Sequence, residues 1–295
     1  MGLIRSELMK IRTTNVWWLF GIGILIFTGM ALTLWLFFGN DQIHQMQNAA
    51  NFTPPTGENI PPEEIERMRR EAAFLADKDR VLHLVASNIY TSGQFFGVMF
   101  VALLGAILFT NENFHQTATA TFLTTPQRVK VIVAKFATAI IAAAFFWVLT
   151  TAINAAAGAI FFNAKGYDAQ LTQWPVTRAI LMNGLAYGLW AVLGVGLGVL
   201  IRNQIGTVVT LAVTYIIGTQ AVQLVFTLIH EFWIKKDWVM DAMVGWPSVA
   251  SQVMVSPEEA YPGSPKWWVG ALVLIGYGLV FGVFGTLVTR TRDIS

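Results

Sequence analysis

The feature that most constrains this chain is a set of six long apolar stretches. A helix needs about 20 apolar residues to cross a bilayer whose hydrocarbon core is about 30 Å thick. Continuous runs of this length favour helices over a barrel, because a helix satisfies its own backbone hydrogen bonds. The sequence therefore predicts an all-α integral membrane protein, with one transmembrane domain over residues 1–295. Its six transmembrane helices are expected at 16–39, 90–110, 131–162, 179–201, 206–230 and 267–289.

The composition supports a membrane protein and excludes several other classes. The chain is 55% hydrophobic and only 12% charged, whereas a soluble domain carries about 25% charged residues. A net charge of +2 does not indicate binding of nucleic acid. The lack of cysteine excludes disulfides and thiolate metal sites. The first apolar stretch follows basic residues, as in a signal peptide. It is longer than a signal-peptide core and no small-residue cleavage site follows it, so we expect a retained helix.

The distribution of basic residues predicts the orientation. Six spans place both termini on one side, and we expect that side to be cytoplasmic. The inner segments would then be 1–15, 111–135, 202–205 and 290–295. They hold nine of the chain's 19 Lys and Arg residues although they are together about half as long as the outer segments. A multi-pass protein of a bacterial cytoplasmic membrane fits this bias.

Three segments outside the spans have a pattern of their own. Residues 2–13 are amphipathic, which suits either a helix on the inner membrane surface or simple basic flanking of the first span. In the outer segment 40–87, Pro62 and two acidic residues predict the start of a charged helix. In the outer segment 231–266, residues 239–255 are too short to span and predict a re-entrant or surface helix. The apolar stripe expected on the charged helix consists of Ile65, Met68, Ala72, Leu75 and Leu82.

No motif in the sequence indicates catalysis. There is no Gly-x-x-x-x-Gly-Lys-Ser/Thr loop for nucleotide phosphates, and His230-Glu231 lacks the second histidine of a zinc protease because Ile234 stands there. We therefore expect no enzyme, no metal site and no cofactor on this chain. The predicted spans also lack acidic and basic residues away from their ends, which disfavours an ion-coupled carrier.

Neutral polar and small residues do occur inside the spans. Gly194, Gly196 and Gly198 predict close helix packing rather than a nucleotide loop. Four amide side chains have two open interpretations, hydrogen bonding between helices or the lining of a substrate path. These are Asn154, Asn183, Gln220 and Gln223.

The inner loop 111–135 is the most informative stretch. It is too long for a tight turn, and Phe114, Phe122 and Leu123 share a face of a helix that would end before Pro126. Such a helix could lie under the membrane and offer aromatic side chains to a cytoplasmic partner. From the residues alone, a structural connector between two spans is an equally good interpretation.

This loop and three further pieces resemble the ABC transporter permeases of the type-2 exporter family. The loop of that family reads Glu-Tyr-Arg-His/Gln-Gly-Thr, an apolar pair, Pro-x-Arg and a lysine entering helix three. Here these positions are held by Glu112, Phe114, His115, Thr117, Phe122, Leu123, Pro126, Arg128 and Lys135. The other pieces are Ser6-Glu7-Leu8-Met9-Lys10-Ile11-Arg12-Thr13-Thr14, Leu200-Ile201-Arg202-Asn203 and Arg290-Thr291-Arg292-Asp293-Ile294.

The resemblance implies a permease subunit that pairs with a second copy or a sister permease. A separate pair of cytoplasmic P-loop ATPase subunits would bind ATP and Mg and dock on a coupling helix near 114–124. Expected cargo is a hydrophobic or amphipathic compound such as a drug, lipid or lipid-linked product, moved outward. The alternative is a non-transporting membrane anchor or sensor whose outer segments 40–87 and 231–266 bind a ligand. ATPase-coupling residues implied by the resemblance are Glu112, Phe114, His115, Thr117, Phe122, Leu123, Pro126 and Arg128.

Overall fold

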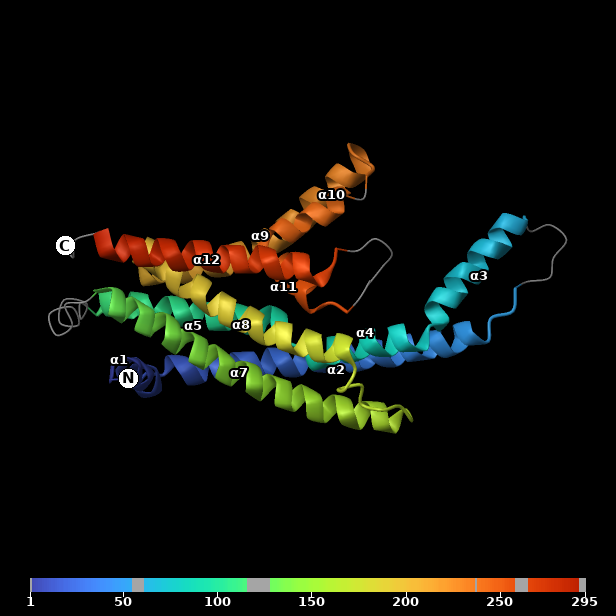
Figure 1. Cartoon of the computed structure of the whole chain (residues 1–295), viewed down its shortest axis with the longest axis horizontal. Coiled ribbons are helices and arrows are strands. Elements are labelled where there is room, and N and C mark those ends of the chain that lie inside the picture. Colours follow the sequence, from blue (N-terminus) through green and yellow to red (C-terminus); the bar gives the residue numbers. More distant parts are fainter. Residues whose placement is uncertain (1, 55–60, 116–127, 237, 258–264, 292–295) are drawn as a thin grey trace.

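Each predicted apolar stretch forms a helix in the computed structural model (Figure 1). The structure describes residues 2–54, 61–115, 128–236, 238–257 and 265–291. Over these residues the secondary structure is entirely helical. Six helices are long and apolar enough to cross a membrane, which confirms the predicted number. The first helix and the end of the last one lie at the same end of the molecule (Figure 1).

The long helices run along one axis, with shorter helices at both ends and beside the bundle (Figure 1). In chain order the helices are α1 Gly2–Thr13, α2 Val16–Ala50, α3 Pro62–Ala76, α4 Lys78–Tyr90, α5 Gln94–Phe114, α7 Arg128–Ala164, α8 Trp174–Ile201, α9 Gln204–Phe232, α10 Trp238–Asp241, the 3₁₀ helix η1 Ala242–Gly245, α11 Pro247–Val255 and α12 Trp267–Thr291. Residues 2–13 thus form a helix, and the charged helix begins at Pro62 as predicted.

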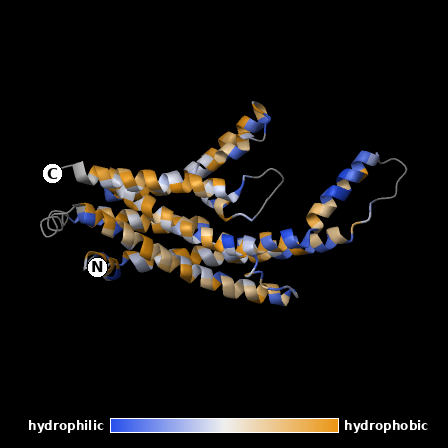
Figure 2. Ribbon diagram, viewed as in Figure 1, coloured by the Kyte–Doolittle hydropathy of each residue, from blue (hydrophilic) through white to orange (hydrophobic). Residues whose placement is uncertain are grey.

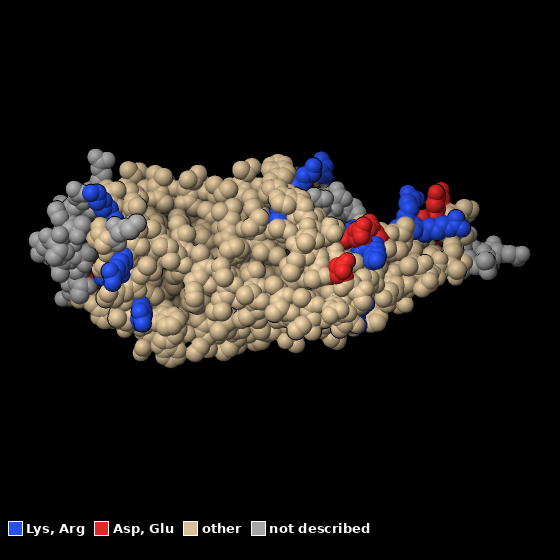
Figure 3. All heavy atoms as spheres, turned by 60° about the horizontal axis from the view of Figure 1, so that its bottom comes forward, with Lys and Arg blue, Asp and Glu red and all other residues tan. Residues whose placement is uncertain are grey.

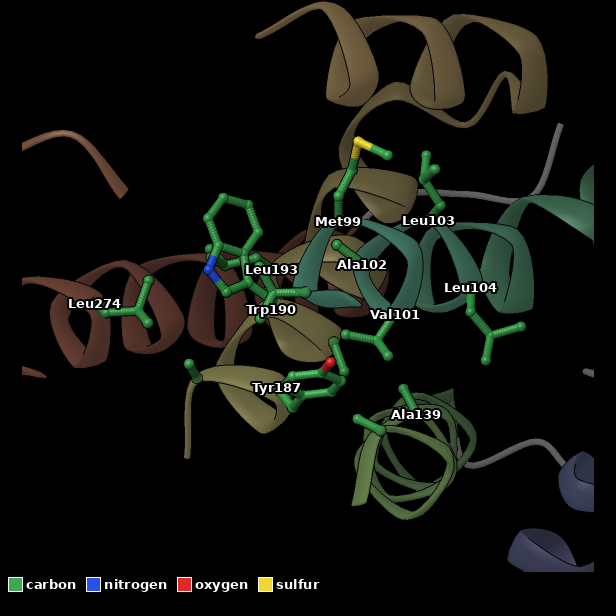
Figure 4. Close-up of a cluster of buried hydrophobic side chains, with 14 of the residues drawn as sticks. Met99, Val101, Ala102, Leu103, Leu104, Ala139, Tyr187, Trp190, Leu193 and Leu274 are labelled. Atoms are coloured by element: carbon green, nitrogen blue, oxygen red, sulfur yellow. The ribbon is translucent and has the colours of Figure 1, made fainter. Parts of the chain in front are cut away.

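The core of the bundle is the pair α5 and α8. Figure 4 shows Val101 and Leu104 of α5 pointing towards α7, where Ala139 lies, while Met99 and Leu103 point to the opposite side. Glycines let the two backbones approach, because a Cβ built on Gly198 would lie 2.8 Å from the Ala106 carbonyl oxygen. A Cβ on Gly194 would overlap the carbonyl of Ala102. The glycine-rich stretch is therefore a close-packing surface, as predicted.

The outer helices leave broad apolar faces uncovered. Only 22% of the apolar window of α2, 17% of that of α9 and 22% of that of α12 is buried within the chain, against 56% for α8. Apolar surface of this extent suits a hydrocarbon environment, where it carries no hydration penalty. Figure 2 shows these helices largely in apolar colours, while α3 is hydrophilic. On the face drawn in Figure 3, charged side chains gather towards the two ends and the middle is largely free of them.

The first span continues well beyond its predicted end. It was expected over 16–39, yet α2 reaches Ala50 through a polar sequence. The reason is tertiary: Ile43 and Met46 on this extension are buried in one apolar cluster with Val85 and Ile89 of α4. The predicted outer segment 40–87 therefore splits into the end of α2, α3 and most of α4.

A break separates α3 from α4, so the predicted apolar stripe is not one surface. Asp77 caps α4, its side chain accepting a hydrogen bond from the Arg80 backbone N–H at 3.1 Å. Leu82 consequently lies on α4 and is buried, whereas Ile65 and Met68 on α3 are half-buried. α3 packs against α2.

The second span is interrupted where it was expected to begin. α4 ends at Tyr90 and α5 starts at Gln94, and Gly93 between them has a φ of +80°, a backbone conformation that favours glycine. Backbone carbonyl oxygens at the break accept hydrogen bonds from a buried side-chain amide. Asn154 Nδ2 of α7 donates to the Ser92 carbonyl oxygen at 3.0 Å and to the Tyr90 carbonyl oxygen at 3.4 Å. The break thus loses little hydrogen bonding although it is buried.

Residues 238–255 form a helical hairpin of α10, η1 and α11 beside α12. Gly245 lies beside Tyr277, whose hydroxyl donates to the Gly245 carbonyl at 3.1 Å. Gly270, nearer the start of α12, lies against Ala250 and Met254 of α11. The hairpin tip at Gly245–Pro247 therefore sits deeper in the bundle than the end of α11, which runs antiparallel to α12.

The role of Asn154 can be tested by removing its hydrogen bonds. Asn154→Leu keeps the shape of the side chain but leaves two buried carbonyls without their donor, so we expect a loss of about 1–3 kcal/mol in the free energy of unfolding. The measurement is thermal unfolding in mild detergent. Asn163→Leu, at an exposed position on the same helix, is the matched control and should change stability by less than about 0.5 kcal/mol. Equal shifts for the two variants would contradict the assigned role.

Candidate functional site

Four charged side chains meet at the end of the bundle where α1 lies. Glu7 and Lys10 come from α1, Glu112 from the last turn of α5, and Lys135 from the third turn of α7. The Lys135 side chain is fully buried, and the residues Glu7 and Glu112 are only 3% and 7% exposed. The Lys10 side chain is 42% exposed. We refer to these four residues as the charge cluster.

Most ion pairs of the charge cluster cross from one helix to another. Lys10 Nζ lies 2.5 Å from Glu7 Oε1 and 2.5 Å from Glu112 Oε1. Lys135 Nζ lies 2.9 Å from Glu7 Oε2 and 3.0 Å from Glu112 Oε1, and it also donates to the Leu108 carbonyl at 3.0 Å. Each lysine thus touches both carboxylates. The cluster carries no net charge and links α1, α5 and α7.

Local sequence explains how the four groups come together. Glu7 and Lys10 are three residues apart on α1 and so share a face of that helix. Lys135 stands in an apolar run, Val131 to Phe136, where an ammonium group must find partners because an unpaired buried charge is very costly. Burial opposes the charge of Lys10, but hydrogen bonds from its ammonium to Glu112 and Glu7 outweigh that effect and raise its pKa above the ordinary value.

The chemistry of the charge cluster is ion pairing rather than metal binding. Within the residues that the structure describes, no group of three or more His, Asp or Glu side chains could hold a metal ion. Buried ion pairs contribute little net stability but define geometry, because removing one partner strands the other. The arrangement therefore fixes α1 against the last turn of α5 and the first three turns of α7.

The structure places part of the predicted coupling surface. Glu112 belongs to the charge cluster, and Phe114 and His115 follow it at the exposed end of α5 with their rings 5.1 Å apart. Arg128 begins α7, though the structure does not describe its side chain. The remaining predicted residues, and the predicted helix that contains them, lie outside the described residues. They are Thr117, Phe122, Leu123 and Pro126.

The four amide residues predicted as a substrate path lie in different surroundings. Asn154 is buried and bonds the α4–α5 break, and Asn183 is buried on α8. Gln220 is exposed and Gln223 half-buried on α9, which leans away from the bundle (Figure 1). No contact joins these two pairs among the described hydrogen bonds. For Asn154, the geometry matches the hydrogen-bonding interpretation.

Sequence reasoning did not select three of the buried charged residues for the site. Glu7 and Lys135 appeared only as parts of the family-like motifs. Arg178 in the second turn of α8 is 1% exposed, and its guanidinium donates to the Ser256 carbonyl at 3.0 Å and lies over the Trp267 ring at 5.0 Å. A lone lysine or arginine inside an apolar run was the available signal, because such a residue must be paired.

The charge balance of the cluster leads to a stability prediction. Lys135→Met leaves two buried carboxylates facing one half-exposed lysine, so we expect it to destabilise the protein by about 3–5 kcal/mol. The measurement is thermal unfolding in mild detergent. Lys130→Met removes an exposed lysine from the same helix and serves as the matched control, with a change below about 0.5 kcal/mol.

A double variant separates charge balance from side-chain packing. Glu7→Gln combined with Lys135→Met again leaves a neutral set, with Lys10 still paired to Glu112. We expect the double variant to be more stable than Lys135→Met alone. If the changes in the free energy of unfolding caused by the two substitutions are additive, the ion pair between α1 and α7 does not govern stability.

Comparison with known proteins assigns this chain to no family. No family model matches it, and no curated protein matches it. The interpretation of the site therefore rests on its geometry and on the sequence patterns themselves.

Proposed function

We propose that this chain is the membrane-spanning permease subunit of an ATP-driven exporter of the ABC type-2 family. The observation that carries the proposal is the composition of the charge cluster. Glu7 and Lys10 belong to the family-like motif near residue 6, whereas Glu112 and Lys135 belong to the family-like loop motif. Two pieces of the sequence about 100 residues apart thus supply the two halves of one buried cluster.

The position of the charge cluster suits force transmission from a cytoplasmic partner. In the proposed exporter, ATP binding closes a separate ATPase pair, which docks on residues near 114–124. These residues lie between Glu112 and Lys135, so a displacement there acts on the ends of α5 and α7. Because the charge cluster ties both ends to α1, the three helices would move together.

Other features support the same function. The sequence has no P-loop, which is expected when ATP is bound by a partner. The turn at Arg202–Asn203, a further family-like piece, joins α8 to α9 tightly, with Asn203 Oδ1 accepting from the Gly206 N–H at 2.8 Å. Uncovered faces on α2, α9 and α12 offer room for a second permease copy or sister permease.

Polarity along the spans favours a hydrophobic or amphipathic cargo. Among the described residues the buried charges are Glu7, Glu112, Lys135 and Arg178. Glu7 lies on the short helix α1, and the other three lie in the first three turns or the last turn of a long helix. The middle of the bundle contains only neutral polar groups, such as Asn154 and Ser251. A drug, lipid or lipid-linked product could cross such an interior, whereas a strongly charged solute would lack partners.

A second candidate function is a membrane anchor or sensor without transport. The observation in its favour is the extension formed by the end of α2 with α3 and α4, which projects beyond the other helices (Figure 1). Purification of the tagged chain in mild detergent distinguishes the two. Recovery of a stoichiometric P-loop ATPase supports the exporter, and a chain that purifies without ATPase activity in several detergents supports the anchor or sensor.

The coupling surface yields a prediction for the complex with its ATPase. Phe122→Ala removes an aromatic anchor from the proposed docking segment, so we expect the affinity for the ATPase to fall about tenfold or more. The ATPase retained per chain is measured after pull-down. ATP-dependent movement of a fluorescent phospholipid is measured in vesicles.

The matched control is Phe52→Ala, which removes an exposed phenylalanine beyond the end of α2 and should leave both quantities unchanged. A Phe122→Ala variant that retains the ATPase and moves lipid like the parent chain would remove residue 122 from the coupling surface.

A further inference from the structure

An apolar pocket of about 210 Å³ opens between α8, α9, α12 and the hairpin of α10, η1 and α11. Trp190 of α8 and Leu211 and Tyr215 of α9 form its floor. Trp246 at the hairpin tip and Tyr277 of α12 form its walls. Four separate segments of the chain thus contribute to one concave surface, which is distinct from the charge cluster.

The pocket lies at the middle depth of the spans. At 1.5 Å per residue, Trp190 is about 24 Å along α8 from Trp174 and about 16 Å from Ile201. Tyr215 is about 16 Å from the start of α9, and Tyr277 is about 15 Å from the start of α12. In a bilayer, this depth corresponds to the hydrocarbon core rather than to the headgroups.

The polar atoms of three aromatic lining residues are bonded within the protein. Trp190 Nε1 donates to Ser251 Oγ at 2.6 Å, and the Tyr215 hydroxyl donates to the Phe95 carbonyl at 2.7 Å. The Tyr277 hydroxyl donates to the Gly245 carbonyl at 3.1 Å. These side chains therefore present their ring carbons to the pocket, and a ligand needs no polar group to match them.

The exposed part of the lining locates the mouth of the pocket. Thr210 and Thr214 on α9 are exposed and Tyr277 on α12 is half-buried. The floor is recessed, since Trp190, Leu211 and Tyr215 are only 7%, 6% and 3% exposed. The pocket thus opens sideways between α9 and α12, two helices whose outer faces are apolar.

The volume of the pocket limits the size of the ligand that it can hold. A cavity of about 150 Å³ takes a benzene molecule, and pockets for drug-sized ligands begin at about 300 Å³. A space of about 210 Å³ lies between these and accepts one segment of an alkyl chain. A whole drug or a headgroup would not fit.

We propose that this pocket binds one acyl chain of a bilayer lipid, inserted sideways between α9 and α12. Bilayer chains are the apolar groups present at this depth, and they match the largely apolar walls and the volume. A chain in the pocket contacts Trp246 and Pro247, so its presence stabilises the inserted position of the hairpin. The proposal concerns a resident lipid and does not depend on the exporter function.

Photolabelling of the full chain tests this site. The purified protein is reconstituted in phosphatidylcholine vesicles containing a phosphatidylcholine with a diazirine in the middle of one acyl chain. After irradiation, labelled residues are mapped by mass spectrometry. We expect labels on the floor residues Leu211 and Tyr215 as well as on exposed residues such as Ile217 and Val280. Labels on exposed residues alone would overturn the proposal.

Substitutions that fill the pocket with a larger side chain provide a control for the labelling experiment. Thr214→Phe places bulk at the mouth, and Leu197→Trp fills the wall on α8, so each should lower floor labelling several-fold while exposed labelling persists. Val213→Phe adds the same bulk on α9 at a residue that is 47% exposed and does not line the pocket. It should label like the parent chain. Unchanged floor labelling in both filling variants would refute the site.

A second copy of the chain is the rival occupant, and a single cysteine tests it. The chain contains no cysteine, so Thr214→Cys provides one thiol at the mouth. If lipid occupies the pocket, oxidation in vesicles yields no cross-linked dimer through this residue. Rapid disulfide formation between two copies, together with an unlabelled floor, would show that protein covers the mouth.

Discussion

The rest of the structure depends on one constraint, that backbone groups buried in an apolar bundle must find partners inside it. The break at Thr91–Gly93 is the place where this constraint acts. Asn154 of α7 bonds the carbonyls of the break, Gln94 Nε2 bonds the Ser251 carbonyl of α11, and Tyr215 of α9 bonds the Phe95 carbonyl. Three neighbouring elements are thereby attached to the start of α5. An interruption that would weaken an isolated helix is here the point at which α7, α9 and α11 are hydrogen-bonded to the start of α5.

The same constraint explains how polarity is distributed along the bundle. Neutral polar side chains donate hydrogen bonds in the middle of the bundle, where a charged group would lack solvation. The buried charged side chains of the long helices lie towards the ends of those helices. Even there the charges are balanced, since the four residues of the charge cluster sum to zero and Arg178 lies over an aromatic ring. The ion pairs add little net stability because desolvation offsets their attraction. Their consequence is geometric: α1 has one position relative to α5 and α7.

The sequence predicts the features of the fold that depend on residues within one span. Features that depend on contacts between distant residues could not be predicted from it. Helix number follows from length and apolar content, which every span carries within itself. The extension of α2 to Ala50 was missed because it depends on Ile43 and Met46 meeting α4. Within the candidate site Glu112 was chosen from a motif, whereas its partners Glu7 and Lys135 could be joined to it only by the folded chain. The pocket was not predictable, because its lining comes from four segments.

The packing of α5 and α8 limits the ways in which the proposed exporter can move. Their backbones are in contact through Gly194 and Gly198, and a shift along the axis would drive neighbouring Cβ atoms into carbonyl oxygens. In the proposed exporter, the pair would therefore move as one body when force reaches α5 through the charge cluster. α9 and α12 are buried far less, so the proposed displacement would be absorbed between them and this body. That boundary contains the apolar pocket, and a lipid chain held there would resist or follow the displacement.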